Sequence, residues 1–229
     1  PAAPVDADEV LAPRQPRLGI PDQQFAQRRP DKGLITKREV RAVSLAALQL
    51  KRDSVVWDIG AGSGSVGLEA ALLSSQGHVY ALEKNGADLA NIEANRHRLQ
   101  LSNYTALHAK APQGLDTLPD PDAVFIGGSG GSLALLIDLV LQRLRPQGWL
   151  VINLVTLENL HTATESLKQL GAQWELSQVT IARSQPILNM QRLSAENPVW
   201  VVAATNPPQP PFTKGGEEAQ PLRVVATVS

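Results

Sequence analysis

The sequence predicts an α/β fold in which a mainly parallel sheet carries helices on both faces. Strand-like and helix-like segments alternate through the central part of the chain, a pattern typical of successive βαβ units. A glycine-rich loop follows the first strand signal and leads directly into a helix signal. Of the 229 residues, 43% are hydrophobic and 19% are charged, which is ordinary for a globular protein with one sizeable core.

The individual elements are predicted from the spacing of their apolar residues. Helical spacing covers residues 36–50, 66–73, 87–99, 132–144 and 156–170. Strand signals, which predict a seven-stranded sheet, cover residues 54–59, 78–82, 104–108, 123–126, 149–154, 178–182 and 199–204. Thr36 and Glu39 match a capping box at the start of the first helix, and Thr156 is placed to cap the last. Because residues 183–198 show no helical pattern, we expect the last two strands to form an antiparallel end of the sheet.

Composition divides the chain into one domain with two flanking segments. Residues 1–20 are rich in proline and are predicted to form an extended lead-in or linker. Residues 21–205 carry the alternating pattern, whereas residues 206–229 combine proline, glycine and glutamate in a tail predicted to be disordered. The sequence begins at Pro1 rather than at a methionine, which leaves open that it is part of a longer protein.

Charge and composition narrow the kinds of partner. A net charge of -1 argues against a protein that binds nucleic acid chiefly through phosphate neutralisation, so a small molecule is the expected partner. The chain has no cysteine, which excludes disulfides, thiolate nucleophiles and cysteine-based metal sites. The histidines are scattered without metal-ligand spacing, and no metal site is predicted. Without a signal-peptide pattern or a long apolar stretch, we expect a cytoplasmic location and no membrane partner.

The glycine-rich loop has the character of a nucleotide-binding site. The first strand signal ends near Asp58, and the loop has glycine at positions 60, 62 and 64. Glycines at this spacing allow positive φ angles and a close approach of the backbone to a ligand, and the following helix presents unpaired N–H groups. The predicted cradle for an adenosyl-type ligand consists of Asp58, Gly60, Ala61, Gly62, Ser63 and Gly64.

Glu83 directly follows the second strand signal, and its carboxylate can accept hydrogen bonds from both hydroxyls of a ribose. Two cofactors fit these features, because Gly62 to Gly67 also matches the dinucleotide pattern G-x-G-x-x-G. The Asp58 carboxylate, placed before the glycines, would repel a pyrophosphate. A cationic sulfonium with an amino-acid tail would instead suit an acidic rim. The loop therefore favours S-adenosylmethionine over NAD.

Three segments of the chain resemble one enzyme family. They are Thr36–Arg41, Asp58–Ser65 and Asp122–Gly130, within a similarity that runs from about residue 19 to residue 205. The chain resembles the decarboxylating precorrin methyltransferases of cobalamin biosynthesis, which belong to the class I S-adenosylmethionine-dependent superfamily. The resemblance implies a Rossmann-like class I methyltransferase fold. It also implies methylation of a precorrin or cobalt-precorrin at carbon 15, with decarboxylation of the carbon 12 acetate. The family resemblance further implies a homo-oligomer, expected to be a tetramer. In some organisms the enzyme is part of a larger methyltransferase.

The resemblance implies which residues bind the cofactor. They are Thr36, the loop from Gly60 to Gly64, Glu83 and Ala111. This chain departs from the family at one place, since Ala109-Lys110-Ala111 stands where the family usually has Gly-Asp-Ala after the third strand. The missing carboxylate removes an expected contact to the adenine amino group and leaves the backbone contact at Ala111.

The substrate is expected at the loop that follows the fourth strand. This small, nearly uncharged loop leaves room for a large flat macrocycle and offers backbone N–H groups to its carboxylates; it consists of Gly127, Gly128, Ser129 and Gly130. Arginines suit the same carboxylates, and the candidates are Arg28, Arg29, Arg41, Arg183 and Arg192. Arg41 is the strongest of these because it lies just behind Thr36 and Lys37. Lys37 and Asn153 complete the predicted substrate contacts.

No catalytic side chain is identified from the sequence. Methyl transfer from an activated sulfonium depends chiefly on positioning, so no strong general base is expected. Two other functions stay open, a class I methyltransferase acting on RNA or protein and, more distantly, an NAD-dependent oxidoreductase. The near-neutral charge and the lack of an Asn-Pro-Pro-Tyr type motif after the fourth strand count against the first of these.

Overall fold

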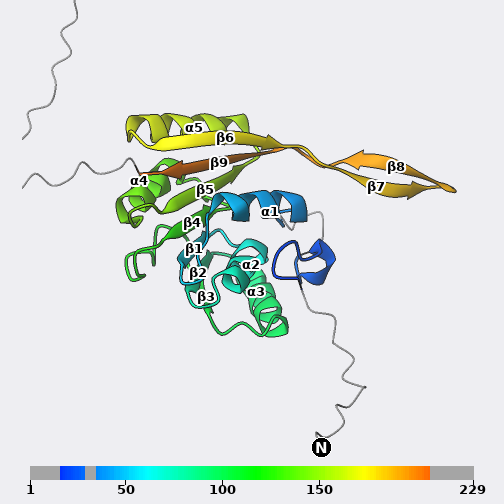
Figure 1. Ribbon diagram of the computed structural model, residues 1–229, viewed down its shortest axis with the longest axis horizontal. Helices are drawn as coiled ribbons and strands as arrows, with labels where there is room; N and C mark the ends of the chain where they lie inside the picture. The colour runs from blue at the N-terminus through cyan, green and yellow to red at the C-terminus, as the bar shows by residue number, and fades with distance from the viewer. Residues whose placement is uncertain (1–15, 29–34, 207–229) are drawn as a thin grey trace, which may run out of the picture.

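The computed structural model describes residues 16–28 and 35–206, which form a large sheet flanked by helices and a separate hairpin (Figure 1). The helices are η1 (Asp22–Gln24), α1 (Arg38–Ala47), α2 (Ser65–Leu73), α3 (Gly86–Arg98), α4 (Leu133–Arg143) and α5 (Leu157–Gln169). The strands are β1 (Val55–Ile59), β2 (His78–Glu83), β3 (Tyr104–His108), β4 (Ala123–Ile126), β5 (Trp149–Leu154), β6 (Gln173–Val179), β7 (Ala182–Ile187), β8 (Met190–Ala195) and β9 (Val199–Thr205).

The large sheet has seven strands in the order β3-β2-β1-β4-β5-β9-β6. Strands β1 to β5 pair in parallel, with Asp58 of β1 opposite Ala81 of β2 and Phe125 of β4. Strand β9 lies between β5 and β6 and is antiparallel to both. The predicted seven-stranded, mainly parallel sheet with an antiparallel end is therefore confirmed. Strand order reverses between β1 and β4, where ligands bind in open α/β sheets.

Helices cover both faces of the sheet, as predicted. Alternate residues of β1 point to opposite faces, so Val56 packs with α1, α2 and α3 while Trp57 packs with α4 and α5. Helix α2 is buried along nearly its whole length, from Ser65 to Ala71. Apolar residues on all sides therefore suit its position between α1, α3 and the sheet.

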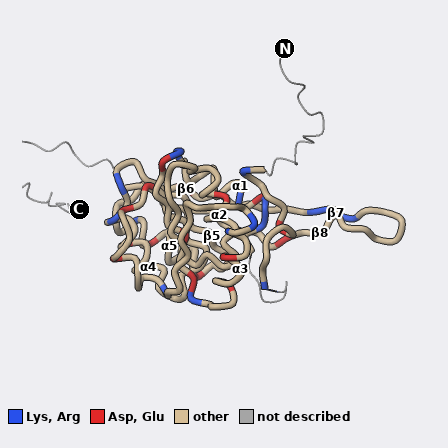
Figure 2. The backbone as a smooth tube through the Cα atoms, turned by 90° about the horizontal axis from the view of Figure 1, so that it is seen from below, with Lys and Arg blue, Asp and Glu red and all other residues tan. Residues whose placement is uncertain are grey.

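The last part of the chain differs from the prediction. The bounds of the strand predicted at residues 178–182 are wrong, since β6 runs from Gln173 to Val179 and β7 begins at Ala182. The connection at residues 183–198 contains most of an antiparallel hairpin, β7 and β8, that forms its own two-stranded sheet. Figures 1 and 2 show this hairpin projecting from the body of the protein. The sequence analysis gives residues 183–198 only as a stretch without a helical pattern, and the hairpin residues are mostly exposed, so they lack the apolar spacing that marks the other strands.

The start of the domain lies slightly before the predicted boundary. Ile20 is fully buried, and the N–H groups of Gly19 and Ile20 donate to the Glu69 carboxylate at 2.8 and 2.9 Å. Residues 19 and 20 thus belong to the folded domain rather than to a linker. Residues 1–15 of the predicted lead-in and residues 207–229 of the predicted tail lie outside the described residues. Across residues 16–28 and 35–206, none of the helices combines the length and the apolar character that crossing a membrane requires.

The two predicted helix caps have different outcomes. Thr156 caps α5 by accepting a hydrogen bond from the Asn159 N–H at 3.3 Å, as predicted. The capping box at Thr36 is wrong, because α1 begins at Arg38 and no side chain caps its first turn. Glu39 instead pairs with Arg183 of β7, and this hydrogen bond lowers the pKa of the Glu39 carboxyl to about 2. Glu39, which the predicted capping box requires at the start of α1, thus links α1 to the β7–β8 hairpin instead.

Candidate cofactor and substrate site

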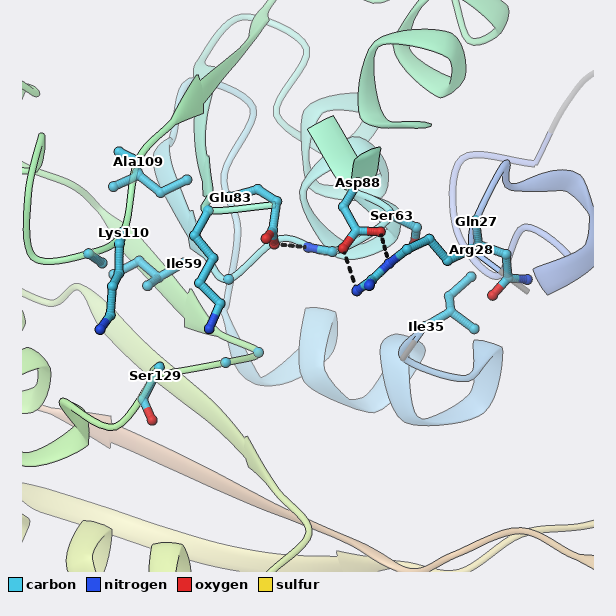
Figure 3. Close-up of a pocket in the computed structure, with 18 residues that line it drawn as sticks. Gln27, Arg28, Ile35, Ile59, Ser63, Glu83, Asp88, Ala109, Lys110 and Ser129 are labelled. Carbon is cyan, nitrogen blue, oxygen red and sulfur yellow. Dashed lines mark hydrogen bonds and ion pairs between the residues drawn. The ribbon is translucent and has the colours of Figure 1, made fainter. Parts of the chain in front are cut away.

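A pocket opens at the carboxyl ends of β1, β2, β3 and β4, on both sides of the point where strand order reverses (Figure 3). It has a volume of about 210 Å³. It is lined by Gln27, Arg28, Ile35, Ile59, Gly60, Gly62, Ser63, Leu82, Glu83, Lys84, Asp88, Ala109, Lys110, Ala111, Gly127, Gly128, Ser129 and Gly130. The pocket thus brings together the glycine loop, Glu83, Ala111 and the loop after β4, four features that the sequence singles out.

The glycine loop is fixed by hydrogen bonds from its backbone N–H groups, most of them to the end of β2. Gly60, Gly62 and Gly64 have φ angles of 72°, 57° and 76°, which favour glycine. The N–H groups of Gly60 and Ala61 donate to the Leu82 carbonyl at 2.9 and 3.1 Å. Two further N–H groups are also engaged, since Gly64 donates to the Ala61 carbonyl at 2.8 Å and Gly62 to Glu83 at 2.8 Å. The loop therefore holds a set shape and has few free N–H groups for a phosphate.

Glu83 at the end of β2 is the acidic residue closest to the loop in the pocket. Its Oε2 accepts from the Gly62 N–H and its Oε1 from the Asn85 N–H, both at 2.8 Å. The side chain is nearly buried, and Figure 3 shows it bonded to the loop. Each carboxylate oxygen has two lone pairs, so the group can still accept hydrogen bonds from two neighbouring hydroxyls of a ligand.

Asp58 lies beneath the glycine loop and does not line the pocket. Its Oδ2 accepts from the Gly67 N–H at 3.0 Å, whereas its Oδ1 has no hydrogen-bond partner among the described residues. Burial raises the pKa of Asp58 to about 7, the hydrogen bond from Gly67 opposes this rise, and the negative charge of Glu83 adds to it. Asp58 thus stabilises the start of α2 through its hydrogen bond from Gly67. Because Asp58 does not line the pocket, its position does not support the predicted direct contact with the cofactor.

The loop from Gly127 to Gly130 lies against the glycine loop. The N–H groups of Gly127 and Gly128 point to the Ile59 carbonyl, at 3.0 and 3.4 Å. A methyl group on Gly60 would lie 2.4 Å from the Gly128 carbonyl oxygen, so only glycine permits this contact. Because Ser129 supplies the single side chain between residues 127 and 130, this side of the pocket is open.

An ion pair closes the opposite end of the pocket. Arg28 binds Asp88 of α3 through two contacts, Nε to Oδ1 at 2.8 Å and Nη2 to Oδ2 at 2.7 Å (Figure 3). Asp88 is buried, and Arg28 is partly exposed. Arg28, one of the predicted arginines, thus lies at the pocket, but its guanidinium group is already paired with the Asp88 carboxylate.

Several predicted substrate residues lie away from the pocket. Arg41 is fully buried, with Glu69, Asp22 and the carbonyls of Ile20 and Thr36 around its guanidinium. Its proposed role at the pocket mouth is therefore corrected to a structural one. The expectation failed because the sequence does not show that Glu69, one turn into α2, faces α1.

The other residues outside the pocket have clear positions. Lys37 is 3.9 Å from Glu196, before β9, and the side-chain Oδ1 of Asn153 accepts from the Ser44 hydroxyl of α1 at 3.0 Å. Arg183 pairs with Asp22 and Glu39, and Arg192 lies on the exposed strand β8. Arg29 lies outside the described residues. Thr36, Ala61 and Gly64 adjoin the pocket in sequence without lining it.

Eight lining residues were not predicted as site residues. They are Gln27, Ile35, Ile59, Leu82, Lys84, Asp88, Ala109 and Lys110. Lys84 could have been found, because it directly follows the strand end that supplies Glu83. Lys110 carried a signal too, as the charged residue where the chain departs from its family. Gln27 and Ile35 come from a segment before α1 whose path no local pattern reveals.

The strand order, the antiparallel β9 and the glycine loop that follows β1 define a class I methyltransferase fold. An S-adenosylmethionine-dependent O-methyltransferase of Thermotoga maritima shares this fold, with a TM-score of 0.67 and 20% identity. The match covers 79% of this chain and 70% of that one. The chain belongs to the precorrin methyltransferase family, because residues 29–206 match the model of the precorrin methyltransferase domain.

Two relatives show how similar the chain is to this family. The cobalt-precorrin-6B C(15)-methyltransferase (decarboxylating) of Salmonella typhimurium is 39% identical over 170 residues, which are 74% of this chain and 88% of the relative. The crystal structure of the precorrin-6y C5,15-methyltransferase of Geobacter metallireducens has a TM-score of 0.80 and 44% identity, and the match covers 85% of this chain and all of that one.

Proposed function

We propose that the protein is an S-adenosylmethionine-dependent methyltransferase that methylates a precorrin or cobalt-precorrin at carbon 15 and releases CO₂ from the carbon 12 acetate. Support comes from family membership together with one observation. The Glu83 carboxylate and the glycine loop meet in a pocket whose facing wall, from Gly127 to Gly130, is almost free of side chains.

The pocket residues suit S-adenosylmethionine better than a dinucleotide. The N–H groups of Gly60, Ala61, Gly62 and Gly64 all have partners within the protein, so they are not available to cradle a pyrophosphate. Glu83 retains acceptor capacity for ribose hydroxyls. When bound, this cofactor supplies a methyl group already activated on a sulfonium.

The protein's own contribution to the reaction is positioning. The rigid loop from Gly127 to Gly130, anchored on the Ile59 carbonyl, leaves space for a flat macrocycle beside the cofactor site. Holding the reacting carbon near attack distance can supply several kcal/mol, about 7–11 in well-oriented systems. When the bond between the acetate's carboxyl and methylene carbons breaks, CO₂ leaves and the ring accepts the electron pair; a proton from solvent then adds at the methylene carbon, which becomes a methyl group. No side chain needs to act as a strong base.

The proposed function is tested by incubating the protein with a precorrin-6B-type tetrapyrrole and S-adenosylmethionine carrying a labelled methyl group. We expect label in the tetrapyrrole, and none in parallel incubations with transfer RNA or with peptides. Calorimetry should show binding of S-adenosylhomocysteine and none of NAD. Binding of S-adenosylhomocysteine without transfer to the tetrapyrrole would retain the methyltransferase and refute the substrate.

A further inference from the structure

The hairpin of β7 and β8 presents apolar side chains to solvent. Eleven large hydrophobic side chains are exposed among the described residues, and four of them lie in this hairpin: Ile187 (42%), Leu188 (93%), Met190 (59%) and Leu193 (74%). Ile187 pairs across the strands with Met190, whereas Leu193 belongs to the pair three positions further along, on the other face. Apolar side chains therefore project from both faces of a hairpin that Figures 1 and 2 show standing clear of the body.

The backbone of the hairpin is open along its outer edges. Within residues 16–28 and 35–206, β7 and β8 pair with each other and with no strand of the large sheet. Each strand thus leaves one row of N–H and C=O groups available to another strand. A two-stranded hairpin is at best marginally stable in water unless further strands or an apolar surface pack against it. The hairpin therefore has the side chains and the edges of a sheet that another chain completes.

The turn of the hairpin places an apolar residue where the backbone disfavours it. Leu188 has a φ angle of 54°, in the left-handed region that favours glycine, asparagine and aspartate. The three other described non-glycine residues with a positive φ are all glutamines. Leu188 is also the most exposed of the large hydrophobic side chains, so no packing within the described protein offsets its unfavourable conformation. Packing of Leu188 against a partner would offset it.

The base of the hairpin is held in one direction. Arg183 of β7 pairs with Asp22 at 2.9 Å and also with Glu39 of α1. These ion pairs tie the first strand of the hairpin to the segment before α1 and to α1 itself. A surface that is already held in place loses little conformational freedom when it binds a partner.

We propose that this hairpin is the surface through which two copies of the chain associate, hairpin against hairpin about a two-fold axis. Residues 184–191 carry no charged side chain, so a charged partner would lose its water there without gaining an opposite charge. The same segment of a second copy matches it in apolar character and in open strand edges. A two-fold axis uses the same patch on both copies, so the contact closes on itself. This inference concerns assembly and does not depend on the proposed function.

The test measures the mass of the full chain by light scattering over a range of protein concentrations. It compares Leu188→Asn, Leu193→Asn and their double variant with Leu157→Asn, a matched control whose side chain, at the start of α5, is 68% exposed. We expect the wild type and the control to form assemblies of at least two copies. Each single hairpin variant should raise the dissociation constant at least about tenfold, and the double variant should be monomeric. Because asparagine suits the positive φ at position 188, Leu188→Asn should keep the turn while it removes the apolar contact.

Hydrogen exchange provides a second measurement. Amides of residues 182–195 should exchange more slowly in the assembled wild type than in the double variant, while those of α5 should exchange equally in both and so show that the variant is folded. A wild-type protein that stays monomeric at every concentration would overturn the inference. An assembly that the double variant leaves intact would overturn it too, because the interface would then lie elsewhere. Equal weakening in Leu157→Asn would refute a specific role of the hairpin, and a monomer whose hairpin variants only raise KM for the tetrapyrrole would assign the hairpin to the substrate instead.

Discussion

Arg41 of α1 donates from Nε to Oε1 of Glu69 on α2 at 2.7 Å, and both side chains are 0% exposed. Glu69 also accepts the N–H groups of Gly19 and Ile20, while Arg41 reaches Asp22 at 3.1 Å. This buried network joins the first described segment to α1 and α2. The same segment carries Gln27 and Arg28 to the pocket, so the network positions one wall of the site.

Replacing Arg41 with methionine should strongly destabilise the fold. The substitution leaves the Glu69 carboxylate buried without its counter-charge, which typically costs about 3–5 kcal/mol. The free energy of unfolding from urea titration measures this loss. Arg41→Met combined with Glu69→Gln should recover part of it, because the neutral amide oxygen can still accept a backbone N–H. A double variant no more stable than Arg41→Met would contradict this account.

A methyl group at position 60 should separate the two loops of the pocket. Gly60→Ala combines an unfavourable positive φ with a contact of 2.4 Å to the Gly128 oxygen. Gly171→Ala is the matched control, since Gly171 has a φ of 66° and nothing within 4 Å of the added carbon. We expect the control to lose about 1 kcal/mol of stability and to retain S-adenosylhomocysteine binding. Gly60→Ala should lose more stability and bind at least about tenfold more weakly; equal effects of the two changes would contradict this prediction.

Asp58 should make stability depend on pH. Its pKa is about 7 in the folded protein against 3.8 for an ordinary aspartate. The folded state therefore keeps a proton that the unfolded chain releases, and the free energy of unfolding falls as pH rises from about 4 to about 7. Asp58→Asn stays neutral, so its stability relative to the wild type should be higher at pH 8 than at pH 5, by a few kcal/mol. Urea titrations of both proteins at the two pH values measure this difference, and an equal difference at both would refute the assignment.

Glu83 should contribute to cofactor binding through its charge. In Glu83→Gln one acceptor oxygen becomes a donor, so the side chain can no longer accept from Gly62, Asn85 and two ribose hydroxyls together. We expect the Kd for S-adenosylhomocysteine to rise about ten- to a hundredfold, measured by calorimetry. Glu175→Gln, on the exposed strand β6, is the control. An unchanged Kd in Glu83→Gln would remove Glu83 from the cofactor site.

The parallel half of the fold was predictable because its strands are buried on both faces. Residues 123–126 form an uninterrupted buried strand, and such a run is visible in the sequence. The hairpin of β7 and β8 was missed because its two strands pair only with each other and are mostly exposed. Its large apolar residues, Ile187, Met190 and Leu193, are exposed as well, so no alternation of buried apolar and exposed polar residues marks its strands. Strand ends identified Glu83 and the loop from Gly127 to Gly130 as pocket residues.

What the sequence could not show were contacts between distant segments. Arg41 was expected at the pocket mouth, yet its partners Asp22 and Glu69 lie 19 and 28 residues away in the chain. A basic residue beside a predicted binding loop gives no sign of whether it faces a ligand or a buried carboxylate. Lys84 and Lys110 line one pocket because the parallel register of β2 and β3 brings their strand ends together, and the sequence alone does not show that register.

The most direct test of the proposed function is the stoichiometry of methyl transfer and decarboxylation in one incubation. A precorrin labelled in the carboxyl carbon of its carbon 12 acetate is mixed with the protein and with S-adenosylmethionine labelled in its methyl group. We predict that one labelled CO₂ is released for each methyl group transferred, and that neither product forms without S-adenosylmethionine. Folded protein that binds S-adenosylhomocysteine but yields neither labelled CO₂ nor labelled tetrapyrrole would contradict the proposed function.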